Sequence, residues 1–304
     1  MTTAAESLPA TAAWWGRLRF FLAAALVWAG LHYVVAQLAL PSGLDRPVVL
    51  VGSSYGVVAG VLLVILLWLA GVVTGLVTGD VSGRKPLMAI GLGLALWAYE
   101  GGAQGGTIDA WLVLVNTVPG PPTAAPYRML LGDYLFLLVG LAGAFAGARW
   151  LGGGGKRDFK TLLGLTNEGG QAQMGPSSLA ITTIVAGVAI FVLTGPPTGA
   201  TYRGQVCFAV AVGLLFGVYA AKRLVGEPGL IWFWPAPLLV GVIGLIIAMV
   251  KPGLMLPVAY GQINSIPACG LVRALPVELV GVGLVASLWL LPESVSQKGP
   301  DETR

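Results

Sequence analysis

The chain has 304 residues, of which 56% are hydrophobic and only 10% are charged, and its mean hydropathy is +0.85. Because a soluble domain carries about 25% charged residues, this composition excludes a soluble protein and indicates an integral membrane protein. The net charge of +4 does not indicate nucleic-acid binding, because the basic residues lie at the ends of apolar segments, where they set membrane topology. We expect the lipid bilayer, and no nucleic acid, as a partner.

Apolar segments recur along the whole chain. Most of them approach the length of about 20 residues that a helix needs to cross the hydrocarbon core. Ten-residue segments of alternating polarity, typical of membrane β-barrels, are absent. The sequence therefore predicts an all-α, polytopic integral membrane bundle of about eight transmembrane helices, at residues 20–40, 54–79, 86–104, 128–150, 178–195, 203–224, 232–251 and 272–292.

The polar segments between these spans divide the chain. Residues 151–177 are rich in Gly and basic residues, which is typical of a flexible linker. We expect five parts: a cytoplasmic N-terminal segment at 1–19, a first four-span repeat at 20–150, this cytoplasmic linker, a second four-span repeat at 178–292 and a cytoplasmic tail at 293–304.

The basic residues predict the orientation. With a cytoplasmic N-terminus, most of the Lys and Arg residues lie on the cytoplasmic side, as the positive-inside rule requires. We expect a multi-pass protein of the cell (inner) membrane with both termini cytoplasmic. The residues on that side are Arg17, Arg19, Arg84, Lys85, Arg149, Lys156, Arg157, Lys160, Lys222, Arg223, Lys298 and Arg304.

A weak internal similarity relates the two halves. Pro86 and Glu100 in the third span align with Pro237 and Lys251 in the seventh at one constant offset. A unit of four spans ends on the side where it began, so its copy inserts in the same orientation. The sequence thus predicts two parallel repeats related by a pseudo-twofold axis along the membrane normal. The aligned motifs also pair Asn116 with Asn264, Arg128 with Arg273 and Asp133 with Glu278.

Ionisable residues inside spans are costly and mark either ion pairs or a functional pathway. Two interpretations are open for the polar layer predicted near the outer face. Its acids and bases neutralise one another and fix the register of the halves, or Arg128 and Arg273 hold a small polar or anionic ligand. For the two asparagines, capping of turns in folded-back outer loops (105–127 and 252–272) competes with ligand contact. The layer comprises Glu100, Lys251, Arg128, Arg273, Asp133, Glu278, Asn116 and Asn264.

A few further residues are chemically notable. His32 is the only histidine, and we weigh a hydrogen bond to a neighbouring helix against a proton relay. Cys207 and Cys269 both fall near the outer face, where a disulfide can form if that face is oxidising. No spacing of His, Cys or acidic residues predicts a metal site, and no motif predicts a cofactor. Glycines spaced four apart, such as Gly71 and Gly75, predict close helix packing within the bundle or at a homodimer interface.

The sequence supports three hypotheses of function and leans against an enzyme. The first is a protein that binds or moves a small polar solute through a layer near the outer face. The second is a structural or assembly subunit of a larger membrane complex, with other membrane subunits or a second copy as partners. The third is an intramembrane lipid-modifying enzyme that uses Asp133, Glu278 or His32 as acid or base. The sequence does not name a substrate.

Overall fold

The computed structural model describes residues 10–36, 50, 56–80, 82–100, 125–152, 174–194, 203–226, 229–250 and 271–291. These residues are helical apart from short turns, and no strand occurs among them. In the first half, α1 (Ala10–Gly30) continues as the π-helix η1 (Leu31–Val35) and is followed by α3 (Gly56–Thr78), α4 (Arg84–Glu100) and α6 (Ala125–Gly152). The second half contains α8 (Gly175–Thr194), α9 (Arg203–Leu224), the short 3-10 turn η3 (Leu230–Trp232), α10 (Ala236–Val250) and α12 (Pro276–Trp289).

Six helices are long and apolar enough to cross a membrane, judged on the described residues by length and composition. They confirm the prediction of an all-helical protein with several membrane spans, although the count of eight spans is not confirmed. The helical segments are Trp14–Val35, Gly56–Thr78, Tyr127–Trp150, Gly175–Thr194, Gly204–Leu224 and Leu230–Val250.

The helices differ from the predicted spans mainly at their ends. α1 begins at Ala10, inside the segment expected to precede the first span, because helical backbone continues beyond the apolar window. α6 extends to Gly152 and α8 begins at Gly175, so both reach into the predicted linker. Hydropathy marks the part of a helix that lies in lipid, whereas hydrogen bonding sets where the helix ends.

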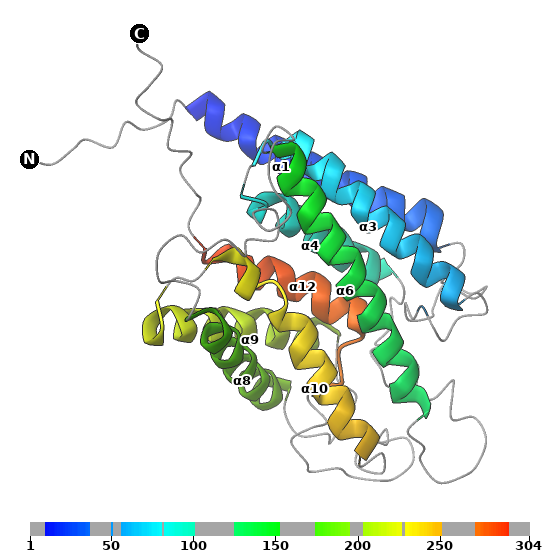
Figure 1. The fold of residues 1–304 in the computed structure, drawn as a ribbon, viewed down its shortest axis with the longest axis vertical. Coiled ribbons are helices and arrows are strands. Elements are labelled where there is room, and N and C mark those ends of the chain that lie inside the picture. The colour runs from blue at the N-terminus through cyan, green and yellow to red at the C-terminus, as the bar shows by residue number, and fades with distance from the viewer. Residues whose placement is uncertain are drawn as a thin grey trace, which may run out of the picture.

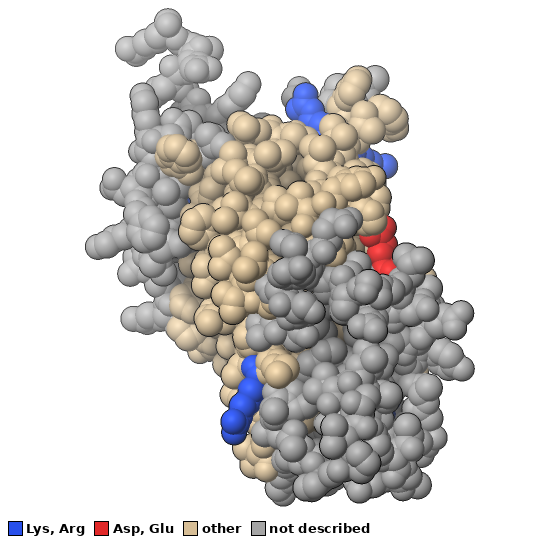
Figure 2. All heavy atoms as spheres, turned by 90° about the vertical axis from the view of Figure 1, so that its right-hand side faces the viewer, with Lys and Arg blue, Asp and Glu red and all other residues tan. Residues whose placement is uncertain are grey.

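The outer surface of the bundle is apolar. Figure 2 shows one face on which the described atoms are mostly uncharged, with Lys, Arg, Asp and Glu at only a few places. Exposed apolar side chains follow one another along α3, including Val61, Ile65, Leu69 and Leu76. A continuous apolar surface of this kind is unstable in water and fits lipid, which supports a membrane-embedded bundle.

The short helix α12 is the centre of the bundle (Figure 1). It contacts α4 and α6 of the first half as well as α9 and α10 of its own half. Val277, Leu279, Val280, Leu284 and Leu288 are all fully buried, so α12 is enclosed over most of its surface. A helix that is apolar all round is expected at such a buried position.

Side chains bind the backbone at both ends of α12. At its start, the Leu275 N–H donates to Glu278 Oε2 (3.0 Å). At its end, Arg84 donates from Nε to the Leu288 carbonyl (2.9 Å), and Lys222 Nζ donates to the Leu290 carbonyl (3.1 Å). An acid near a helix start and cations near its end also complement the helix dipole.

Close helix packing follows the predicted glycines. Gly71 and Gly75 of α3 lie against the backbone of Ala144 and Ala148 on α6, so a Cβ at Gly71 would overlap that backbone. Gly217 of α9 lies instead against the Thr182 carbonyl of α8. These glycines therefore form contacts inside the bundle, but the two stripes use different neighbouring helices in the two halves.

Replacing Gly71 by valine tests this packing. The new side chain must separate α3 from α6, and overpacking of this kind costs about 1–3 kcal/mol. We expect a lower thermal unfolding temperature in detergent for Gly71→Val than for the unmodified protein. Gly204→Ala is the control, because no atom lies within 4 Å of a Cβ at Gly204. Equal unfolding temperatures for both variants would contradict the close α3–α6 contact.

Candidate functional site

The polar residues of the first and second halves gather at one end of the bundle, which we call the polar end. It is the end at which α4 finishes and α12 begins, because Arg84 at the start of α4 contacts Leu288 at the end of α12. His32, Glu100, Asp133, Arg273 and Glu278 all lie within the helix turns nearest this end or beside them. The opposite end, which carries Arg84 and Lys222, is called the basic end.

His32 and Glu100 form a contact between α1 and α4. His32 Nδ1 and Glu100 Oε2 lie 2.8 Å apart, and this is the one ion pair between residues that the structure describes. Their side chains are 40% and 37% exposed, so the pair lies at the surface of the bundle. The hydrogen bond thus joins α1 to the end of α4.

The local backbone of His32 is unusual. The α-helix changes to the π-helix η1 at Leu31, and His32 is its second residue. The Trp28 ring stacks on the imidazole at a centroid distance of 5.5 Å, while the Tyr33 ring meets it edge-on at 4.8 Å. Single π-helical turns within α-helices are frequent at functional sites. Two rings and one carboxylate thus hold the imidazole in a fixed orientation.

Asp133 and Glu278 are buried acids on the two central helices α6 and α12. Asp133 is 0% exposed, and its Oδ2 accepts a hydrogen bond from the Leu50 N–H (3.0 Å). Glu278 is 3% exposed and accepts the Leu275 N–H described above. Each carboxylate therefore receives a backbone N–H, which compensates part of the cost of burying it.

Tyr134 lies near both acids. Its side chain is buried, and both Asp133 and Glu278 are close enough to act on it electrostatically. Its hydroxyl contacts the backbone of α10 at Gly241, where any larger residue would overlap the ring. Tyr134 thus packs α6 against α10 of the second half. Sequence reasoning missed this residue, although a tyrosine next to an intramembrane acid is a usable signal.

The two predicted arginines have different environments. Arg273 is only 6% exposed, whereas Arg128 is exposed. Among the described residues, neither one forms an ion pair with Glu100, Asp133 or Glu278. The mutual neutralisation expected for the polar layer is therefore not found between its described members.

Several predicted residues lie outside the described part of the chain. They are Asn116, Asn264, Lys251 and Cys269. The proposed pairing of Glu100 with Lys251 and the disulfide between Cys207 and Cys269 thus stay predictions. Cys207 itself lies on α9 and is half-buried. No group of three His, Cys, Asp or Glu residues suited to a metal ion occurs among the described residues.

A double-mutant cycle on His32 and Glu100 measures their contact. Because both side chains are partly exposed, we expect a coupling free energy of about 0.2–1 kcal/mol between His32→Ala and Glu100→Ala in chemical unfolding. Arg17→Ala with Glu100→Ala is the control cycle, because Arg17 lies towards the basic end, and its expected coupling is zero. A zero coupling for both cycles would show that the pair does not join α1 to α4.

No protein family model, curated protein or solved structure matches the chain. The function proposed below is argued from the geometry of the polar end. There, the structure brings His32 together with Glu100, and Asp133 together with Tyr134 and Glu278, in a bundle of apolar helices.

Proposed function

We propose that the protein binds or moves a small polar solute at the polar end of the bundle, and that an acidic group of the solute faces Arg273. The observation that carries this proposal is a largely buried arginine that has no partner in the described part of the chain. Arg273 is 6% exposed, and among the described residues it has no hydrogen bond and no ion pair. Burying an isolated charge costs several kcal/mol of folding free energy. A buried arginine without an ion-pair partner therefore indicates a binding function.

The neighbouring acids support this interpretation. Asp133 and Glu278 accept hydrogen bonds from the backbone N–H groups of Leu50 and Leu275. Each acid is thus part of the local fold, and neither one holds the guanidinium of Arg273. The positive charge of Arg273 is left to attract an anionic group.

The proposal includes a duplicated architecture of eight spans. The contacts between the halves support it: α4 packs on α12 and α6 packs on α10, and a twofold axis that exchanges the halves interchanges these two pairs. The second helix of each half also ends near a glycine of positive φ, Gly79 (63°) and Gly226 (103°). The different neighbours of the glycine stripes indicate that the repeats have diverged.

We also propose that the basic end faces the cytoplasm of a cell with both termini on that side. Arg84, Arg149, Lys222 and Arg223 lie at or next to helix ends there, which is the distribution that the positive-inside rule predicts. The polar end then faces outward, where a solute can reach Arg273 from the outside.

Replacing Arg273 by glutamine tests the function. We expect at least one small anion from a panel of acetate, succinate, sulfate and phosphate to raise the unfolding temperature of the purified protein. A ligand at a hundred times its Kd stabilises by about 2.7 kcal/mol, and Arg273→Gln should abolish that gain. Without ligand, the same variant should be at least as stable as the unmodified protein, because it removes an uncompensated buried charge.

Arg17→Gln is the matched control, since Arg17 is exposed at the basic end and far along α1 from the proposed site. It should leave the effect of the anion unchanged. A stabilisation that persists in Arg273→Gln, or a complete absence of stabilisation by the panel, would contradict the proposed function.

A further inference from the structure

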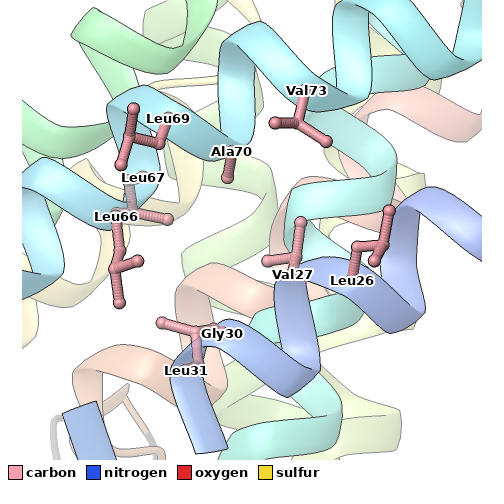
Figure 3. Close-up of a pocket in the computed structure, with 9 residues that line it drawn as sticks. All are labelled: Leu26, Val27, Gly30, Leu31, Leu66, Leu67, Leu69, Ala70 and Val73. Atoms are coloured by element: carbon pink, nitrogen blue, oxygen red, sulfur yellow. The ribbon is translucent and has the colours of Figure 1, made fainter. Parts of the chain in front are cut away.

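An apolar cavity of about 230 Å³ lies between α1 and α3. Figure 3 shows side chains from the two helices facing each other across it. Its lining includes Val27, Gly30 and Leu31 from α1 and Leu66, Ala70 and Val73 from α3. A cavity of about 150 Å³ lined by such residues is enough to hold benzene, so this one has room for a longer stretch of hydrocarbon.

The cavity opens towards the lipid-facing surface. Leu26, Leu69 and Val73 line it and are 46%, 55% and 40% exposed. Since these side chains lie on the apolar outside of the bundle, the hydrocarbon chains of the bilayer have direct access to the cavity.

A second hollow lies nearer the basic end of the same helix pair. It is lined by Trp15, Gly16 and Arg19 of α1 and Thr78 of α3. Arg19 precedes Gly30 by eleven residues, which places it on nearly the same face of α1 and about 17 Å further along the helix. We call the two hollows together the α1–α3 groove. The guanidinium of Arg19 and the indole of Trp15 lie at its end nearer the basic end, and the apolar cavity lies further along it.

The Trp15 ring gives the second hollow an interfacial character. It is 57% exposed and contacts the Trp14 ring edge-on at 5.7 Å. Tryptophan is enriched at the level of lipid headgroups, where its ring is half in apolar surroundings. The Thr78 hydroxyl donates to the Thr74 carbonyl (2.7 Å), so its oxygen can still accept a hydrogen bond.

We propose that the α1–α3 groove binds an anionic phospholipid, with its phosphate on Arg19 and one acyl chain in the apolar cavity. Charge complementarity selects the headgroup, because Arg19 is the charged residue of the second hollow. Arg19 and Gly30 lie about 17 Å apart along α1, which is a separation that one phospholipid can span from its phosphate to the middle of an acyl chain. This site is separate from the polar end and does not depend on the proposed solute.

Native mass spectrometry of the full-length protein tests the headgroup contact. After addition of dioleoyl phosphatidylglycerol or dioleoyl phosphatidylcholine, we expect one molecule of the anionic lipid to be retained preferentially. Arg19→Gln should lower the association constant of the anionic lipid by about tenfold, which corresponds to the loss of one charge-assisted hydrogen bond. Arg19→Lys should keep the preference for the anionic lipid.

Arg17→Gln is the matched headgroup control, because two residues turn a helix by about 200° and place Arg17 away from the groove. Preferential retention that is equal in Arg19→Gln and Arg17→Gln would overturn the proposal, as would equal retention of both lipids by the unmodified protein. Displacement of the lipid by millimolar inorganic phosphate would assign Arg19 to free phosphate and would also overturn it.

The acyl chain is tested separately by Ala70→Leu, which fills the cavity. We expect weaker retention of dioleoyl phosphatidylglycerol, whereas a short-chain phosphatidylglycerol should bind Ala70→Leu and the unmodified protein equally. Val61→Leu is the control, since nine residues place it on the opposite side of α3. Unchanged retention in Ala70→Leu, with an unfolding temperature equal to that of Val61→Leu, would exclude the cavity as the chain site.

Discussion

The constraint on which the rest of the structure depends is the enclosure of α12. Its 14 residues span about 21 Å, less than the hydrocarbon thickness of about 30 Å, so its ends cannot both reach water. In lipid, backbone groups must be satisfied by the protein itself. Glu278 meets this need at the start of α12, and Arg84 and Lys222 meet it at the end. Both halves of the chain contribute helices to the enclosure, which explains why the two halves form one bundle.

The same constraint distinguishes charged side chains that bind groups of the protein itself from a charged side chain that can bind a solute. Asp133 and Glu278 hold backbone N–H groups, and Arg84 holds backbone carbonyls, so these charges are part of the fold. His32 and Glu100 hold each other at the surface. Arg273 is buried and lacks such a partner among the described residues. Among the ionisable residues at the polar end, Arg273 is therefore the strongest candidate for contact with a solute.

Sequence reasoning predicted what depends on composition and spacing. The apolar windows located the helices, and the glycine spacing at Gly71 and Gly75 predicted close packing. The helix that packs against a glycine stripe is determined by small residues in distant segments of the chain. The pairs α3–α6 and α9–α8 could therefore not be predicted from the sequence around each stripe. The partner of His32 was hidden for the same reason, because Glu100 lies 68 residues away. Asp133 and Glu278 stood out in the sequence because an acidic residue inside a membrane span is energetically costly. The backbone N–H groups that bind them are brought close only by the fold.

Access of water to Arg273 from the polar end tests the central claim most directly. A single cysteine at this position (Arg273→Cys), in a chain whose Cys207 and Cys269 are replaced by serine, can be exposed to a membrane-impermeant thiol reagent in sealed vesicles. The account predicts labelling of this cysteine from the side of the polar end. No labelling from that side, while a cysteine at the exposed position 128 (Arg128→Cys) reacts, would contradict a solute site at Arg273.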